Sequence, residues 1–304
     1  MTKLHLLARP SLAVSLALAV AACARSGDSR PDLLVASARA GDYAIYVLNA
    51  DGSAQTRLTE NAAARSSNGV FFQVEPDWSP DGRSIAFASR RGGSFDIYVM
   101  NADGTGTRRL TATSDDDDNP TWSPDGRRLA FNRAGDIYVM SADGTGVRRV
   151  TVEMDPQTDP AWSPDGKWIA YVRGSQGTVG VDLRELWLVQ PDGKRNHALT
   201  TMGVSSYSPA WSPNSTRVAF ATNVESTQFD IYTIGVNGTG LQRVTVNAQD
   251  TFEPAWSPDG KTIAYSEGGA IYVTDAAGQA ANRITDETNN DSSPDWSPVP
   301  ASTG

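Results

Sequence analysis

The stretch that decides the fold is EPAWSPDGKTIAY, Glu253 to Tyr265, which reads as a short strand, a tight turn and a second strand. Asp-Gly between two apolar runs favours a turn, because glycine reaches positive φ without a steric clash and aspartate can hydrogen-bond nearby backbone. The preceding proline fixes φ near the value that the turn requires. The residues that follow, Ile263 to Tyr265, are of types enriched in strands. The segment therefore predicts a β-hairpin.

Near copies of this hairpin recur along the whole chain. They are EPDWSPDGRSIAF (75–87), NPTWSPDGRRLAF (119–131), DPAWSPDGKWIAY (159–171), SPAWSPNSTRVAF (208–220) and a truncated SPDWSP (293–298). The tryptophans of the six copies, at positions 78, 122, 162, 211, 256 and 296, are separated by 44, 40, 49, 45 and 40 residues. A period in the forties indicates a repeat architecture.

A second hairpin follows in each unit. Its first arm resembles DIYVMNADG and begins at residues 44, 96, 136, 185, 230 and 270, and its second arm ends in tripeptides such as Arg109-Leu110-Thr111. Each unit therefore offers four short strands. Such a sheet cannot bury both faces alone but can do so between two like neighbours, which describes a propeller blade.

The count of strands predicts how the ring closes. The first unit opens at Asp32–Ser37 with a second strand and has no Trp-Ser-Pro strand before it, whereas the copy at 293–298 has no blade of its own. We expect an all-β fold, a six-bladed β-propeller of four-stranded antiparallel blades over 32–298, closed by the C-terminal strand pairing into the first blade. Closure removes two sheet edges that would otherwise invite aggregation. Residues 299–304 form a C-terminal tail.

The first 22 residues are not expected to belong to the fold. Lys3 and Arg9 give a basic start, and the apolar run Leu12 to Ala22 is shorter than the roughly 20 residues that a bilayer span needs. This pattern fits a secretory signal. It resembles the bacterial lipoprotein signal, which implies that Cys23 is the acylated first residue of the mature chain. Residues 23–31 read as a tether.

Cys23 is the only cysteine, so it has no disulfide partner in the chain, which favours lipidation. The alternative is an ordinary signal peptide with a chance cysteine near its cleavage site. More than one acyl chain makes a stable anchor, and we expect the outer membrane, facing the periplasm, as the location. Ala24 follows the cysteine, and no aspartate stands there to indicate retention in the inner membrane.

Charge narrows the classes of partner. Removal of residues 1–22 discards two basic residues and no acidic one, which leaves 24 basic against 35 acidic residues and a net charge of −11. A chain this acidic is a poor candidate for nucleic acid or for an anionic bilayer surface. Partners should be neutral, basic or metal-bearing.

The two faces of the expected ring differ. The turns from first to second and from third to fourth strands are short and uniform, and we call their side the short-turn face. The joins on the opposite side vary, and include 60–74, 114–118 with its four aspartates, and an insertion at 173–182. Binding residues concentrate on variable loops held by a rigid scaffold, so this variable-loop face is the candidate binding surface.

The residues that precede the proline of each innermost strand should ring the mouth of the central channel. They are Glu75, Asn119, Asp159, Ser208, Glu253 and Ser293. They are candidates for binding a partner or a cation, and oxygen ligands from Asp117, Asp118, Asp159 and Glu253 could hold Ca²⁺. The alternatives are a solvated polar channel whose pre-proline residues are simply extended, and an aspartate run 115–118 that is only a solvated loop.

Aromatic residues give a weaker indication, and catalysis has little support. The repeated tryptophans should pack between blades, whereas Trp168, Trp187, Phe71 and Phe72 depart from the repeat and are candidates for partner contacts. The mature chain has one histidine, His197, which argues against a multi-histidine metal site or a Ser-His-Asp triad. No nucleophile elbow, P-loop or dinucleotide fingerprint occurs. We expect no catalytic residues and no cofactor other than Ca²⁺.

The repeat W-S-P-D-G-x-x-[IL]-A-[FY] followed by D-I-Y-V-M-x-A-D-G resembles the WD-like Pro-Asp repeat of TolB-like propellers, over Asp32 to Pro298. The resemblance implies a non-enzymatic, monomeric scaffold that binds an envelope protein, with a peptidoglycan-associated lipoprotein as one such partner. A lipid-anchored member of this group is the expectation, although the N-terminal domain of TolB has no counterpart here. Similar repeats form the gating propeller of prolyl-oligopeptidase-like peptidases, and we expect no hydrolase domain in this chain. The alternatives are a polysaccharide-binding module and a propeller lyase or hydrolase acting on an envelope glycan.

Overall fold

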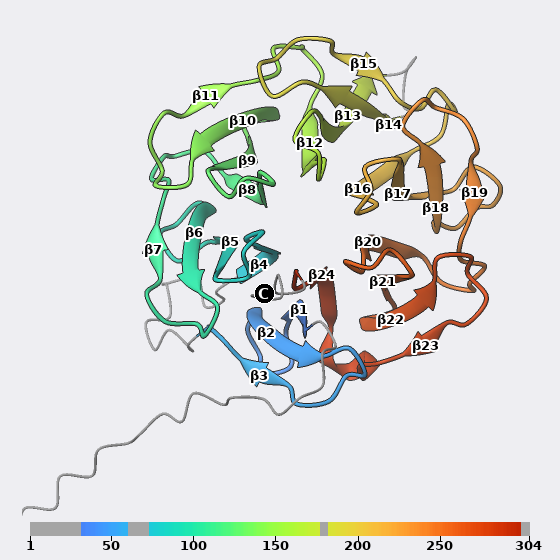
Figure 1. The fold of residues 1–304 in the computed structure, drawn as a ribbon, viewed down its shortest axis with the longest axis horizontal. Helices are drawn as coiled ribbons and strands as arrows, with labels where there is room; N and C mark the ends of the chain where they lie inside the picture. Colours follow the sequence, from blue (N-terminus) through green and yellow to red (C-terminus); the bar gives the residue numbers. More distant parts are fainter. Residues whose placement is uncertain (1–31, 60–72, 177–181, 299–304) are drawn as a thin grey trace, which may run out of the picture.

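The chain folds into a ring of six four-stranded sheets arranged around a central axis (Figure 1). The computed structural model describes residues 32–59, 73–176 and 182–298. The signal peptide, Cys23, the tether, Phe71, Phe72 and the tail 299–304 lie outside the described residues. The sequence prediction of a six-bladed, all-β propeller is confirmed.

Each blade runs from an innermost strand beside the central axis to a two-residue strand at the rim. Blade 1 contains β24 (Asp291–Trp296), β1 (Asp32–Ser37), β2 (Ala44–Asn49) and β3 (Thr56–Arg57). Blade 2 contains β4 (Gln73–Trp78), β5 (Ser84–Ser89), β6 (Asp96–Asn101) and β7 (Arg108–Arg109). Blade 3 contains β8 (Asp117–Trp122), β9 (Arg128–Arg133), β10 (Asp136–Ser141) and β11 (Arg148–Arg149).

The other three blades follow the same order. Blade 4 contains β12 (Gln157–Trp162), β13 (Ile169–Gln176), β14 (Asp182–Val189) and β15 (His197–Ala198). Blade 5 contains β16 (Ser206–Trp211), β17 (Arg217–Thr222), β18 (Asp230–Gly235) and β19 (Gln242–Arg243). Blade 6 contains β20 (Thr251–Trp256), β21 (Thr262–Glu267), β22 (Ala270–Asp275) and β23 (Asn282–Arg283), and the 3₁₀ turn η1 (Glu287–Asn289) leads back to β24.

The ring closes by pairing the last strand with the first. β24 runs antiparallel to β1, with Leu33 opposite Trp296 and Ser37 opposite Asp291. The closing strand begins two residues before the SPDWSP copy that the sequence singled out. Its pairing with β1 leaves blade 1 composed of both ends of the propeller chain, as Figure 1 shows where the blue and red strands meet.

The repeated threonine of the Arg-Leu-Thr tripeptides links the rim of each blade to its third strand through a side-chain hydrogen bond. In blade 2 the hydroxyl of Thr111 accepts a hydrogen bond from the backbone N–H of Ile97, 2.9 Å away and buried. The corresponding threonines of the other blades are 59, 151, 200, 245 and 285. Because the fourth strands are only two residues long, this side-chain bond replaces ladder bonds that they cannot make.

The repeated tryptophans pack between blades, as the sequence predicted. Trp162 lies in an apolar cluster with Ala130, Ile137 and Val139 of blade 3 and with Ile169 of its own blade. Burying an aromatic side chain of this size removes 150–250 Å² of surface from water. The core is therefore a series of inter-blade layers.

A close approach between neighbouring blades requires glycine in the turn from third to fourth strand. Gly278 has φ +78°, and a Cβ on it would lie 1.8 Å from the carbonyl oxygen of Val244 in the preceding blade. Gly52 meets Ile284 in the same way at the seam between blades 1 and 6. Glycine is therefore required at this turn by the close contact between blades as well as by the turn geometry.

The insertion at 173–182 lengthens a hairpin. β13 and β14 are eight residues each, and their pairing extends to Gln176 opposite Asp182. Blade 4 therefore projects further than its neighbours on the variable-loop face. In the described parts of the chain, no helix has the length and apolar character to cross a membrane.

Candidate functional site at the channel mouth

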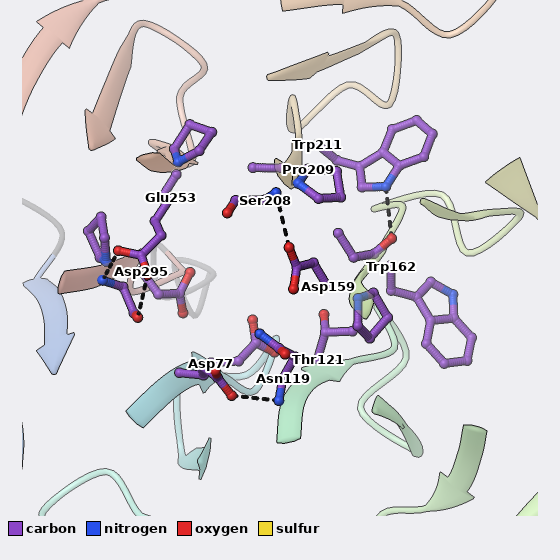
Figure 2. Close-up of a pocket in the computed structure, with 18 of the residues that line it drawn as sticks. Asp77, Asn119, Thr121, Asp159, Trp162, Ser208, Pro209, Trp211, Glu253 and Asp295 are labelled. Atoms are coloured by element: carbon purple, nitrogen blue, oxygen red, sulfur yellow. Dashed lines mark hydrogen bonds between the residues drawn. The ribbon is translucent and has the colours of Figure 1, made fainter. Parts of the chain in front are cut away.

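The six innermost strands surround a central cavity of about 530 Å³. Each strand contributes the pre-proline residue, the proline, and the residue that precedes the repeated tryptophan. Figure 2 shows these side chains converging from all sides, with Asp159, Glu253, Asp77 and Asp295 among them. The structure thus brings together the six residues that the sequence placed around the channel: Glu75, Asn119, Asp159, Ser208, Glu253 and Ser293.

The pre-proline residues are left-handed, so the expectation that they are simply extended is wrong. Their φ values lie between +50° and +55°. Each innermost strand also shifts register at this point, as between Asp118 and Thr121 in blade 3. A left-handed non-glycine residue costs about 1–2 kcal/mol. The bulge at this position frees the backbone N–H from the ladder, and neighbouring carboxylates accept some of these N–H groups.

Three carboxylates bridge neighbouring blades through these N–H groups. The N–H of Asn119 donates to Glu75 Oε2 at 2.6 Å, that of Ser208 to Asp159 Oδ2 at 3.2 Å, and that of Ser293 to Glu253 Oε2 at 2.8 Å. Acidic and neutral residues therefore alternate around the ring, with the acids on blades 2, 4 and 6. A hydrogen bond contributes about 0.5–1.5 kcal/mol net, which offsets part of the backbone strain.

A second layer of acids lies at the position before the repeated tryptophan, and the sequence reasoning missed it. Asp295 accepts the backbone N–H of Trp78 at 2.7 Å, and Asp77 accepts that of Trp122 at 2.6 Å. The signal was present, because this position is acidic in blades 1 and 2 and threonine or alanine elsewhere.

Burial raises the pKa values of several acids in and beside the channel. Desolvation, with repulsion from Asp118, Asp159 and Glu253, raises the pKa of Glu75 to about 8. Burial raises the pKa of Asp118 to about 6 and that of Asp295 to about 7. The channel therefore holds bound protons at neutral pH.

Burial also raises the pKa values of Asp77 and Asp159. Burial, together with the charge of Asp295, raises the pKa of Asp77. Burial raises the pKa of Asp159, against the opposing effect of Arg184. Because carboxylates share the site, each ionisation makes the next one less favourable.

The four residues expected to hold calcium do not form one cluster. Asp117 is buried and makes a two-pronged ion pair with Arg133, at 2.6 and 2.8 Å, whereas Asp118 accepts from the amide of Asn132 at 2.6 Å. In residues 32–59, 73–176 and 182–298, no group of three or more His, Cys, Asp or Glu side chains is arranged to hold a metal ion. Asp117 is therefore engaged by Arg133, and calcium stays a prediction for Asp118, Asp159 and Glu253.

Three aromatic rings pack together against the apolar core between blades 5 and 6. The rings of Tyr207 and Phe229 have centroids 5.4 Å apart, and those of Phe229 and Phe252 are 5.1 Å apart. All three residues are half-buried. The sequence reasoning missed them, although Tyr207 and Phe252 directly precede the pre-proline residues of β16 and β20.

The tryptophans that the sequence suggested for partner contacts lie away from the channel. Trp168 packs edge-on against His197 of the rim strand β15, with ring centroids 5.3 Å apart. The guanidinium of Arg173 lies 4.4 Å from the Trp187 ring and pairs with Asp155. Neither tryptophan is among the described residues that line the channel, and the Nδ1 of His197 contacts the carbonyl oxygen of Arg195 at 2.7 Å.

These features define a closed six-bladed propeller with an acid-lined channel. A family model described as "TolB beta propeller domain" matches residues 64–188 and 184–302. The chain therefore belongs to the TolB β-propeller family, and this family supports a protein-binding scaffold role.

Individual relatives align over short stretches. The Tol-Pal system protein TolB of Syntrophus aciditrophicus is 39% identical over 49 residues, which are 16% of this chain and 11% of that protein. An uncharacterised protein of Agrobacterium fabrum is 35% identical over 69 residues, 23% of this chain and 21% of that protein. The chain thus aligns with 21% and 11% of the length of these two curated relatives.

Solved structures show the same fold. The crystal structure of TolB from Acinetobacter baumannii superposes with a TM-score of 0.74 at 19% identity, covering 89% of this chain and 67% of that one. This likeness concerns the architecture alone.

Proposed function

We propose that this protein is a non-enzymatic envelope lipoprotein whose propeller binds another envelope protein through the variable-loop face. Membership of the TolB β-propeller family supports a protein-binding role, and the signal-like segment before Cys23 supports export and lipid anchoring. The name of the Syntrophus relative, a Tol-Pal system protein, supports a partner in the cell envelope, such as a peptidoglycan-associated lipoprotein.

The observation that carries the proposal is where exposed apolar side chains lie. Met154 is fully exposed, and Val152 and Val246 are 74% and 75% exposed. All three stand on joins from a fourth strand to the next innermost strand, hence on the variable-loop face. Val147 and Leu241, in the short turns, are about half as exposed, at 40% and 39%. The more exposed apolar side chains therefore lie on the variable-loop face, which favours that face over the short-turn face for contact with a protein.

The channel chemistry favours a protein over an acidic glycan. The described residues that line it include carboxylates and no lysine or arginine. Carboxylates repel a polyanionic chain, so the residues that line the channel do not by themselves favour an acidic glycan. Turnover of acidic envelope glycans by the purified protein would support the enzyme alternative instead.

The test is site-specific photo-cross-linking in intact cells. A benzophenone amino acid replaces Val152 or Val246 on the variable-loop face, and Arg127 or Lys167 on the short-turn face as matched controls. We expect one discrete protein adduct from the first pair and none from the second. Adducts of equal yield from both faces, or from neither, would contradict the proposal.

Anchoring is tested separately. Incorporation of labelled palmitate and recovery in the outer-membrane fraction should both be lost when Cys23 is replaced by serine. Unchanged labelling of Cys23→Ser would exclude lipidation at this residue.

A further inference from the structure

The rim strand of blade 4 differs from those of the other five blades at one position. The first residue of the repeated Arg-Leu-Thr tripeptide is arginine at positions 57, 109, 149, 243 and 283, and it is Ala198 in blade 4. Ala198 of β15 stands opposite Trp187 of β14. In the other blades a tyrosine stands opposite the arginine, as Tyr138 does opposite Arg149 in blade 3. Blade 4 therefore combines a larger ring with a much smaller rim residue.

The rim arginine of each of the other five blades pairs with a carboxylate. In blade 3 the guanidinium of Arg149 donates to Asp136 at 2.6 Å and to the carbonyl oxygen of Thr151 at 2.7 Å. The acid partners of the arginines at 57, 109, 243 and 283 are Asp42, Asp96, Asp230 and Glu287, at 3.2, 2.6, 2.5 and 2.5 Å. A filled rim position thus contains a guanidinium, an acid and an aromatic ring.

Blade 4 keeps the acid of this arrangement. Glu185 begins the segment ELWLV as Asp136 begins DIYVM in blade 3. Its carboxylate accepts the hydroxyl of Thr200, and it accepts the backbone N–H of Gly203 at 2.9 Å. Among the described residues, no lysine or arginine forms an ion pair with Glu185. Because a carboxylate offers about four acceptor positions, Glu185 can accept further hydrogen bonds from a cation.

A cavity of about 410 Å³ lies at this position, and we call it the rim pocket. It is lined by Glu185, Trp187, Ala198 and Thr200 together with the ion pair of Arg173 and Asp155. Trp187 and Ala198 are half-buried, so solvent reaches the ring. Asp155 stands on the join that leads from blade 3 to blade 4, directly after the fully exposed Met154. The rim pocket therefore opens toward the variable-loop face.

Blade 1 shows how two guanidiniums are accommodated around one ring. Arg39 and Arg57 lie 4.4 and 5.9 Å from the centroid of Tyr46, and they pair with Asp291 and Asp42. Two cations are thus balanced by two acids.

Blade 4 has the same two acids around its ring and one of the two cations. The guanidinium of Arg173 lies 4.4 Å from the Trp187 ring and pairs with Asp155, which leaves Glu185 as the second acid. A second guanidinium in the rim pocket would restore the balance seen in blade 1.

The lining of the rim pocket favours a guanidinium over an ammonium. A guanidinium is planar, stacks on aromatic faces and is more weakly hydrated than an ammonium. Tryptophan gives the strongest cation–π contact of the aromatic side chains, and a carboxylate can accept two parallel N–H bonds from one guanidinium. Trp187 and Glu185 supply these two partners from the same strand.

We propose that the rim pocket binds an arginine side chain of the partner protein, with its guanidinium between Trp187 and Glu185. The partner's arginine then occupies the place that the chain's own rim arginine fills in the other five blades. This inference rests on the proposed function and names the residue type that the variable-loop face recognises.

The test follows the indole N–H signal of Trp187 by NMR in the mature chain with Cys23→Ser, and Trp187→Phe assigns the signal. The probe is N-acetyl-arginine amide. The citrulline analogue removes the charge, and the lysine analogue keeps the charge without the planar group. We expect a saturable shift with the arginine probe and a Kd at least about fivefold lower than for either analogue. Equal binding of the three compounds, tighter binding of the lysine analogue, or no saturable shift would overturn the proposal.

A fourth compound distinguishes a protein side chain from a small guanidinium ligand. Propylguanidinium reproduces the end of the arginine side chain without the peptide groups. We expect it to bind no more tightly than N-acetyl-arginine amide. Tighter binding of propylguanidinium would assign the rim pocket to a small molecule and overturn its assignment to a protein partner.

Protein variants locate the site. Glu185→Gln should weaken the arginine probe about fivefold or more, because it removes the charge and keeps an acceptor for Gly203. Ala198→Arg supplies the rim arginine from the chain itself, so it should abolish the shift without lowering the melting temperature. Ala280→Arg adds the same charge at an exposed alanine of blade 6 and should bind the probe as the wild type does. Binding retained in Ala198→Arg, or lost equally in Ala280→Arg, would overturn the assignment.

Failure of this inference is distinguishable from failure of the proposed function. In cells, Ala198→Arg should greatly reduce the adduct formed from position 152, and Ala280→Arg should not. An adduct that Ala198→Arg leaves unchanged would keep the scaffold role and overturn the arginine pocket. Absence of any adduct in the otherwise unaltered chain would contradict the scaffold role, and the indole titration would still decide whether the rim pocket binds arginine.

Discussion

Leu33 and Trp296 stand opposite each other in one antiparallel pair, although 262 residues of chain separate them. The indole N–H of Trp296 also donates to the carbonyl of Ala255 in blade 6, 3.1 Å away. One residue therefore completes the sheet of blade 1 and binds the neighbouring blade. The stability of the whole ring depends on this seam.

Replacement of Trp296 by alanine should open the ring. The side chain is only 6% exposed, and a buried tryptophan replaced by alanine typically costs about 3–5 kcal/mol. At about 2–4 °C per kcal/mol for a chain of this size, thermal unfolding followed by circular dichroism should show a drop of roughly 10 °C or more. Truncation before Asp291 should lower the melting temperature further, and removal of 299–304 alone should not. An unchanged melt of the truncated chain would contradict ring closure.

Gly278→Ala should destabilise the protein more than Gly41→Ala. Both glycines have positive φ, at +78° and +88°, so both alanine variants carry backbone strain. A Cβ at Gly278 would collide with Val244, whereas nothing lies within 4 Å of one at Gly41. Overpacking adds about 1–3 kcal/mol, which urea unfolding would resolve as the difference between the variants. Equal losses would mean that the inter-blade contact carries no constraint.

Glu75→Gln should stabilise the protein at high pH and have little effect at low pH. The folded pKa of Glu75 is about 8, above its ordinary value of 4.5. The folded state therefore holds a proton that the unfolded state releases, and the associated stability, complete below pH about 4.5, is lost as pH rises toward 8. The carboxylates that face Glu75 are Asp118 from β8, Asp159 from β12 and Glu253 from β20, with Arg184 near Asp159.

The measurement is the free energy of unfolding at pH 5 and pH 8.5. The neutral amide can still accept the N–H of Asn119, so the variant should gain about 1 kcal/mol or more relative to the wild type at pH 8.5. Glu287→Gln, whose side chain is about half exposed, serves as the control and should show no such change. A gain that is the same at both pH values would rule out burial of the charge as its cause.

Asp117→Ala should cost about 3–5 kcal/mol, because it leaves a buried guanidinium without its partner. The Arg133 side chain is 14% exposed, and its guanidinium also lies 5.2 Å from the Phe131 and Tyr138 rings. Asp115→Ala, in the exposed part of the same aspartate run, should change stability by less than about 0.5 kcal/mol. Chemical denaturation of both variants decides between a structural and a solvated role for Asp117.

Calcium binding is checked by melting the protein in Ca²⁺ and in chelator. A cation bound only to the folded state at about 100 times its dissociation constant adds about 2.7 kcal/mol. The expected rise in melting temperature should vanish in Asp118→Asn and should persist in Asp115→Asn. Identical melting temperatures in Ca²⁺ and chelator would contradict the calcium prediction.

Local sequence pattern was enough to predict the blades. At the channel, local preference predicted the wrong backbone conformation for the pre-proline residues. Asp-Gly turns and β-branched runs specify hairpins within a few residues. The repeats therefore predict the number of blades and identify the C-terminal copy at 293–298 as the strand that completes the first blade. The pre-proline residues were expected to be extended because proline disfavours helical values before it. They are left-handed, since a bulge lets neighbours such as Glu75 accept an N–H from the next blade.

The sequence shows which residue types are available for the site, but it does not show which of them come together in the folded chain. Tyr207 and Phe252 occupy equivalent positions of successive repeats, whereas Phe229 comes from a join, so the repeat alone does not show that the three rings come together. Asp117 and Asp118 are neighbours in sequence yet serve different purposes, because successive residues of a strand point to opposite faces. Their separation removed one ligand from the expected calcium set.

The sequence by itself determined the number of blades, the strand order within each blade and the strand that closes the ring, because turns and strand patterns are local properties that a repeat states six times. Only the tertiary structure decided which acids share the channel, which of their pKa values burial raises, and which aromatic rings pack together between blades 5 and 6. Those properties depend on distances between blades, and such distances exist only once the ring has closed.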